Sequence, residues 1–335
     1  MVTREMTSAT SIAAPRAQPL SRALGNGTLI VLAIYVLMFA IFAASQPGAL
    51  SVGSITELCN NALPLALAAA GGTLVVLTRG FDLSVAGVVA LSNVLVATQI
   101  GDGPAGALEG LALVLAIGLA VGAVNGFLVA YVRLQSIAST LATMIVCSGL
   151  ALLVLDAPGG AVPDFISYGL TDTIGGTVPV AAVIATGVIL VWLAIQRTDW
   201  GVALYAIGAD ETAATLAGIQ TRRVKFLAYC LAGTCYGLSG YMLSALTATG
   251  NPNAGNSYLL LMFAAIAIGG TAFSGGRGGV VGSMIGAATL TLLQKVLFSA
   301  GVSSFYTGIF QGVVMIVAVL IAALSAHLAR GREAS

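Results

Sequence analysis

The feature that most constrains this chain is a series of long apolar runs separated by short clusters of charged residues. Residues 28–45 and 308–324 hold no charged side chain, and neither run has a polar face at the 3.6-residue helical period. About 20 such residues form a helix that crosses the roughly 30 Å hydrocarbon core of a bilayer. Only 7% of the 335 residues are charged, whereas soluble domains carry about 25%. The chain is therefore predicted to be an integral membrane protein.

Charged residues, prolines and polar clusters divide the chain into about ten spans of near-membrane length. We expect an all-α, polytopic transmembrane helical bundle over residues 28–327, with a disordered cytoplasmic tail at 1–27 and a second cytoplasmic tail at 328–335. The predicted spans are 28–45, 60–78, 83–100, 108–132, 139–155, 178–196, 224–246, 258–273, 279–298 and 306–327.

The distribution of charge along the chain predicts its orientation. If the amino terminus is inside, the connections alternate, and every one of the 13 lysines and arginines except Lys295 falls on the inner side. Cytoplasmic connections of membrane proteins carry an excess of Lys and Arg. An even number of spans with both termini in the cytoplasm is therefore predicted. The outer connections carry the acidic residues Glu57, Asp102, Glu109, Asp156, Asp164 and Asp172.

Two predicted spans carry glycine at every fourth position. The residues are Gly118, Gly122 and Gly126 in span 108–132, and Gly278, Gly282 and Gly286 in or at the edge of span 279–298. Glycines four residues apart lie on one helical stripe and allow neighbouring helices to approach closely. These spans are the fourth and the ninth, which is the spacing of an inverted five-plus-five repeat. Since the chain holds 42 glycines, chance spacing is the alternative.

The residues present argue against an enzyme and against a nucleic-acid partner. A phosphate-binding loop needs Lys followed by Ser or Thr, but Lys225 and Lys295 are followed by Phe226 and Val296. The single histidine, His327, excludes a metalloprotease His pair, and the four cysteines form no C-x-x-C pair. The net charge is +1, without the basic block that phosphate backbones require. We therefore expect no catalysis and no bound cofactor or metal in this chain.

Four polar residues in or near the predicted spans are candidates for a path or gate. Arg79 and Asp82 lie three residues apart at the break between two spans, where ionisable groups face a cavity, a partner or the interface. Either they pair with each other or with backbone groups and fix a turn at Gly80, which we favour, or they line the cytoplasmic mouth of a path. Asn93 and Asn125 lie inside spans and serve either a polar path or, as the more common use, interhelical hydrogen bonds.

The longest inner connection, 197–225, is predicted to hold a short capped helix. Asp210 can cap this helix, Glu211 lies in its first turn and Gly218 can end it. Either the helix is a solvated surface element, or it is a docking segment for a cytoplasmic partner, which we favour. Its small and apolar contact residues would be Ala213, Ala214, Leu216 and Ala217.

Four ordered blocks resemble the ribose-type branch of the membrane permeases of ATP-driven bacterial importers. The DLSVG signature of that branch is similar to LTRGFDLSVAGVVALS, in which Ala86 stands before Gly87. Its cytoplasmic pattern G-x-N-x-x-A-A-x-x-x-G-I resembles GVALYAIGADETAATLAGI, with Asp210 where Asn is usual. The matching positions are Ala213, Ala214, Gly218 and Ile219. The other two blocks are NGFLVAYVRLQSIASTLATM and AAIAIGGTAFSGGRGGVVGSMIGA, and the resemblance covers about residues 28–324.

This resemblance implies a homodimeric, multi-pass permease of the bacterial inner (plasma) membrane that imports a monosaccharide or similar small polar solute by alternating access. It implies cytoplasmic ATP-binding subunits, which hold ATP and Mg²⁺ and dock on residues 210–219, and a periplasmic or lipid-anchored solute-binding protein. Related permeases carry nucleosides or branched-chain amino acids, so these solutes are alternatives. An ion-gradient-driven secondary transporter is the rival class, but it would be expected to place a carboxylate or histidine mid-span.

Overall fold

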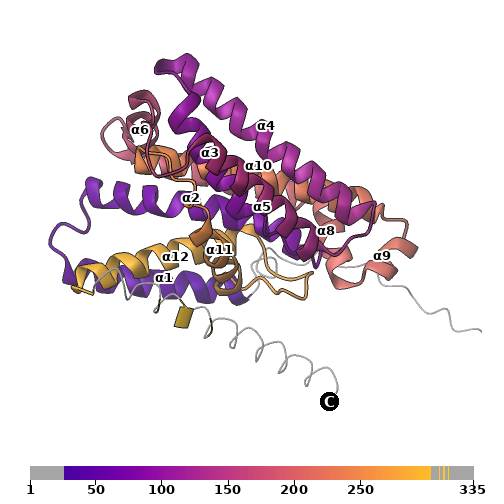
Figure 1. Ribbon diagram of the computed structural model, residues 1–335. Coiled ribbons are helices and arrows are strands. Elements are labelled where there is room, and N and C mark those ends of the chain that lie inside the picture. Colours follow the sequence, from indigo (N-terminus) through magenta and orange to yellow (C-terminus); the bar gives the residue numbers. More distant parts are fainter. Residues whose placement is uncertain (1–25, 303–308, 310–311, 314–315, 317–335) are drawn as a thin grey trace, which may run out of the picture.

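The structure is a computed structural model that describes residues 26–302 together with 309, 312–313 and 316. In these residues it consists of helices and one two-stranded hairpin (Figure 1). The helices are α1 (Asn26–Ser45), α2 (Val52–Leu77), α3 (Val85–Gln99), α4 (Gly103–Ala130), α5 (Ser136–Val154), α6 (Asp164–Thr171), α7 (Val180–Ile195), α8 (Asp199–Ala209), α9 (Glu211–Leu216), α10 (Thr221–Thr247), α11 (Asn256–Ile268) and α12 (Val280–Ser299). The antiparallel strands are β1 (Thr173–Ile174) and β2 (Val178–Pro179).

Every predicted span from 28–45 to 279–298 overlaps a helix, and the predicted all-α transmembrane bundle is confirmed in the described part. Six of the described helices are long and apolar enough to cross a membrane, or seven if α7 and α8, bent by 79°, form one span. Helices α3 and α11 are apolar but shorter. The span count of ten stays a prediction, because span 306–327 lies almost wholly outside the described residues, as do the tails 1–27 and 328–335.

Helices α2 and α4 begin five or more residues earlier than predicted, and a side chain caps each of them. Helix α2 begins at Val52 rather than residue 60, since Ser51 Oγ accepts a hydrogen bond from the Ser54 N–H (3.2 Å). Helix α4 begins at Gly103 rather than 108, since Asp102 Oδ1 accepts from the Gly103 N–H (2.8 Å). The predicted boundaries are too late because a helix can continue past the membrane surface. Carboxylates in its first turns, such as Glu57 of α2 and Glu109 of α4, then remain in water.

Helices α2 and α10 form the centre of the bundle. In the most apolar stretch of 18 residues, 89% of the α2 residues and 67% of the α10 residues are buried inside the protein. Helix α2 contacts α10, α11 and α12, while α10 also contacts α3 and α4. By contrast, only 11% of the residues in the corresponding stretch of α1 and 22% of those in α5 are buried. Their exposed apolar side chains are the surface expected to face lipid.

Glycine brings α4 and α10 into backbone contact. A Cβ atom at Gly118 would meet the carbonyl of Gly233, and one at Gly122 or Gly126 would meet the α10 backbone at Tyr229 or Phe226. The two helices therefore pack at a separation that no larger residue allows.

The second predicted glycine stripe lies between α11 and α12. Cβ atoms at Gly282 and Gly286 would meet the α11 backbone and its C-cap at Ala265 and Gly269. Gly278, placed at the edge of the predicted span, lies outside the helix, because α12 begins at Val280. Gly278 lies in the preceding loop with a φ of 104°, a left-handed conformation that favours glycine.

One end of the bundle gathers basic side chains. Helix α9 lies at the other end of the long helices α4 and α10 from α6 (Figure 1). The α9 end gathers Arg79, Arg133, Arg222 and Lys225 around one cavity. Lys295, the one basic residue predicted outside, forms an ion pair with Glu57 of α2, which reduces the conflict with the charge rule.

The α4–α10 contact generates a stability prediction. We expect Gly118→Ala to destabilise the protein by about 1–3 kcal/mol, because the added methyl overlaps the Gly233 backbone. The matched control is Gly149→Ala in α5, where nothing lies within 4 Å of the added Cβ. Thermal unfolding in detergent measures both variants. Equal unfolding temperatures for the two would contradict the close contact.

Candidate functional site

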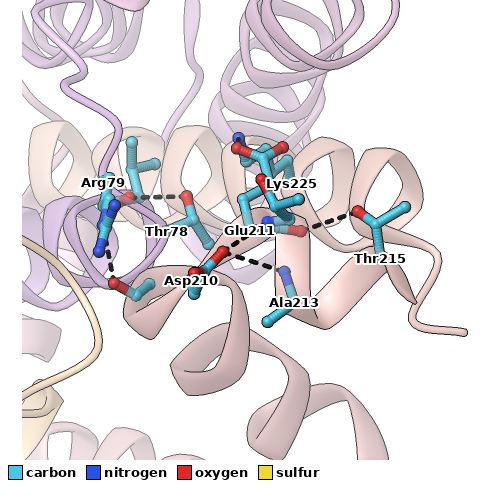
Figure 2. A network of polar contacts seen from close by, with 10 residues as sticks. Thr78, Arg79, Asp210, Glu211, Ala213, Thr215 and Lys225 are labelled. Carbon is cyan, nitrogen blue, oxygen red and sulfur yellow. Dashed lines mark hydrogen bonds and ion pairs between the residues drawn. The ribbon is translucent and has the colours of Figure 1, made fainter. Parts of the chain in front are cut away.

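The connection between α7 and α10 folds into two helices at the basic end of the bundle. Asp210 separates α8 from α9, and its Oδ1 accepts hydrogen bonds from the N–H groups of Thr212 (2.8 Å) and Ala213 (3.0 Å) (Figure 2). The predicted capped helix is therefore present, and Gly218 follows it with a φ of 86°.

The Asp210 cap depends on the charged form of its carboxyl group. Donation from the Ala213 and Thr212 N–H groups holds the pKa of Asp210 below its usual range. Because the pKa is lower in the folded state, the cap contributes fully above the ordinary Asp pKa. Its contribution is lost as the pH falls through the lowered value, so the cap is intact at neutral pH.

Helix α9 presents only part of the predicted contact surface to solvent. Leu216 is 86% exposed, and Ala213 and Ala217 are exposed as well. Ala214, by contrast, is 5% exposed and lies in the main core cluster. Successive helical residues are about 100° apart, so Ala214 can face the bundle while Ala213 faces solvent. Ala214 therefore anchors α9 to the bundle and does not belong to the exposed surface.

Arg79 fastens the end of α8 to the end of α2. Its Nε donates to the Gly208 carbonyl (2.8 Å) and its Nη2 donates to the Ala209 carbonyl (2.6 Å). Figure 2 shows the Arg79 side chain reaching toward the end of α8, beside Asp210. These carbonyls end α8, where no further turn of helix satisfies them and the helix dipole is negative. Arg79 thus joins the break after α2 directly to the residue before Asp210.

An ion pair joins α9 to α10. Lys225 Nζ lies 2.6 Å from Glu211 Oε2, with side chains 18% and 49% exposed respectively. The charge pattern of the sequence placed Lys225 on the inner side but gave no sign of this partner, because the two residues are too far apart for a helical i,i+4 pair. A half-exposed pair of this kind contributes about 0–1 kcal/mol, so it orients α9 more than it stabilises it.

A polar cavity of about 710 Å³ lies beside α9 at this end of the bundle. Its basic lining residues are Arg79, Arg133, Arg222 and Lys225, and its one acidic residue is Glu211. Sequence reasoning counted these arginines toward the inner side without assigning them a site. Only the fold brings the connection 131–135 next to the start of α10.

Arg79 and Asp82 do not pair with each other in the described structure. Asp82 is 1% exposed, and its Oδ1 accepts hydrogen bonds from the Ser84 N–H (3.0 Å) and Ser84 Oγ (2.6 Å). Both residues therefore bind backbone groups instead of each other: Arg79 binds carbonyls at the end of α8, and Asp82 binds an N–H group at the start of α3. Asp82 Oδ2 has no partner among the described residues.

The two asparagines form hydrogen bonds between elements. Asn93 of α3 donates to Ser244 Oγ (3.0 Å) and the Thr249 carbonyl (3.1 Å), and its Oδ1 accepts from the Asn251 N–H (2.7 Å). Asn125 of α4 accepts from Thr143 Oγ1 of α5 (2.8 Å). Both side chains are fully buried. Their geometry fits the interhelical role better than a path.

The comparisons with known proteins identify the family. A family described as the branched-chain amino acid transport system / permease component matches residues 54–319. The chain belongs to this permease family. The ribose import permease protein RbsC of Bacillus subtilis (strain 168) is 37% identical over 305 residues, which cover 88% of this chain and 91% of that protein. RbsC of Escherichia coli (strain K12) is 33% identical over 294 residues, covering 85% and 90% respectively.

A third relative has a more general name. The inner membrane ABC transporter permease protein YjfF of Escherichia coli (strain K12) is 31% identical over 300 residues, covering 86% of this chain and 89% of that protein. No solved structure matches the chain.

As a member of this permease family, the chain is a transport subunit of an ATP-driven importer and not an enzyme. It is an integral protein of the bacterial inner membrane. Membership implies an ATPase subunit and a solute-binding protein as partners. The resemblance to the ribose-type permeases is thereby confirmed.

Proposed function

We propose that this permease carries a monosaccharide into the cell. The observation that supports this most is the alignment with ribose import permeases over 85–88% of the chain. The buried polar residues of the described part fit an uncharged solute, since they carry hydroxyls and amides and only Asp82 among them carries a formal charge. A zwitterionic amino acid, which the family description names, would call for opposite charges near its path.

Uptake by reconstituted permease tests this function. With its ATPase and solute-binding partners in proteoliposomes, the permease is expected to take up labelled ribose or a related sugar only when ATP is supplied. Uptake should persist when an ionophore collapses all ion gradients at constant ATP. Transport of leucine or adenosine in place of every sugar would contradict the solute. Loss of uptake with the ionophore would contradict ATP coupling and favour a secondary transporter.

The docking site for the ATPase subunit is, in this proposal, the exposed surface of α9 with the adjoining residues Gly218 and Ile219. ATP and Mg²⁺ bind on that partner. The support comes from geometry, because α9 is joined to α10 through the Glu211–Lys225 ion pair and follows directly on the end of α8, which Arg79 binds from the end of α2. A push on α9 is thereby transmitted to the central helices, as rigid-body alternating access requires.

A substitution at Leu216 tests the docking surface. We expect Leu216→Asp to lower co-purification of the ATPase subunit at least about fivefold, because a charge replaces an exposed apolar contact. The control is Tyr168→Asp in α6, a residue that is 70% exposed at the opposite end of the bundle. Ala214 is unsuitable for this test, since a change there loosens α9 itself. Unchanged co-purification of the Leu216 variant would contradict the docking role.

The full topology in this proposal has ten spans in an inverted five-plus-five repeat, with both termini in the cytoplasm. When the spans are numbered in order, α2, α3 and α4 of the first half correspond to α10, α11 and α12 of the second. The helix contacts follow this correspondence: α4 contacts α10 as α12 contacts α2, and α3 contacts α10 as α11 contacts α2. In each half, a long helix is followed by a left-handed residue, Arg79 (φ 63°) or Ala248 (φ 55°), and then by a short apolar helix. An odd number of spans per half inverts the second half.

Labelling chemistry tests the orientation. In a variant with all four native cysteines replaced by serine, an impermeant maleimide on right-side-out vesicles should label Asp172→Cys. It should label Arg223→Cys only after the vesicles are opened. Labelling of both positions from outside would contradict the topology.

The permease is further proposed to act as a homodimer, with the path between or within two copies. Large apolar faces of α1, α4 and α5 remain exposed in the single chain, and a second copy would cover part of them. A mass measurement in detergent that finds only one permease chain in each complex with the ATPase subunit would contradict this.

A further inference from the structure

The cavity beside α9 carries an excess of positive charge that the described residues of the protein do not neutralise. Of its basic lining residues, Arg79 is bound to the carbonyls of Gly208 and Ala209, and Lys225 is paired with Glu211. Arg133 and Arg222 are exposed and form no ion pair within the part of the chain that the structure describes. The cavity therefore offers two unneutralised guanidinium groups to an anionic ligand.

The wall of this cavity continues into an exposed aromatic surface. Val129, Ala130 and Leu134 line the cavity at the end of α4. In the same turns, Phe127 and Tyr131 are 54% and 40% exposed and stack with ring centroids 5.9 Å apart. Phe226 of α10 packs edge-on against Tyr131 at 6.0 Å. Aromatic side chains gather in this way where a membrane protein crosses from hydrocarbon to water.

We propose that this cavity binds the headgroup of an anionic phospholipid, with the phosphate held by Arg133 and Arg222 and an acyl chain lying along Phe127, Tyr131 and Phe226. A soluble anion would use the arginines but gain nothing from the aromatic surface. An acidic segment of a protein partner would approach from water and not along the helix sides. A phospholipid can contact the arginines through its phosphate and the aromatic surface through its acyl chain at the same time. Basic pockets on the cytoplasmic side of membrane proteins suit such headgroups.

A bound headgroup would also support the segment proposed to dock the ATPase. Glu211, Thr212, Thr215 and Leu216 of α9 line the same cavity as Arg133 and Arg222. A lipid in this cavity therefore touches α9 on one side and the ends of α4 and α10 on the other. This consequence rests on the proposed function, whereas lipid binding itself does not.

Native mass spectrometry of the purified permease tests the binding. Phosphatidylglycerol is expected to bind more tightly than phosphatidylcholine of the same chain length. The double variant Arg133→Gln/Arg222→Gln should lose about thirtyfold in affinity for phosphatidylglycerol, on the order of fivefold for each cationic side chain. The matched control is Arg223→Gln, because Arg223 is exposed in the same turn of α10 but does not line the cavity.

Further arms separate this site from the alternatives. Arg133→Lys/Arg222→Lys keeps the charge and should retain most of the binding, which excludes misfolding as the cause of a loss. Inorganic phosphate alone should not raise the unfolding temperature. Equal binding of the two lipids, an equal loss in the Arg223 control, or stabilisation by phosphate without any lipid preference would each overturn the proposal. None of these outcomes depends on the solute or on the ATPase partner.

Discussion

In hydrocarbon no water is available to peptide groups, and every part of this structure depends on that constraint. Within long helices the backbone satisfies itself, so the difficult places are those where a helix stops inside the bundle. After α2, the buried carboxylate of Asp82 accepts from the Ser84 backbone and hydroxyl. After α10, the buried amide of Asn93 binds the backbone of Thr249 and Asn251. Each break thus persists because a polar side chain replaces the missing water.

The same constraint explains how the basic end is organised. The end of α8 has free carbonyls, and Arg79 donates to two of them from the break after α2. The next residue, Asp210, caps α9 and remains charged at neutral pH. One continuous set of polar contacts therefore runs from the central helices to the exposed helix α9. This continuity is what makes α9 suitable for passing force from a soluble partner into the bundle.

Much of the fold could be predicted because hydrophobic length and charge are local properties. The predicted spans overlap helices, and the cap at Asp210 has the residue type that its turn requires. Helix starts were less predictable, because the caps Ser51 and Asp102 stand outside the apolar runs. The candidate site was predicted as a segment, but Ala214 was wrongly assigned to its exposed contact surface. In a helix as short as α9, which residue faces inward is decided by the packing partner, and here it is Ala214.

The sequence by itself determined that the chain is an integral membrane protein whose basic residues gather on one side, because runs of about 20 apolar residues are long enough to cross the hydrocarbon core as helices. It also determined which family it joins. Only the tertiary structure decided that Gly118 meets Gly233, that Arg79 binds α8 and not Asp82, and that Arg133 and Arg222 share a cavity. These contacts join residues far apart in the chain. Their partners depend on how helices pack, and local pattern does not encode that geometry.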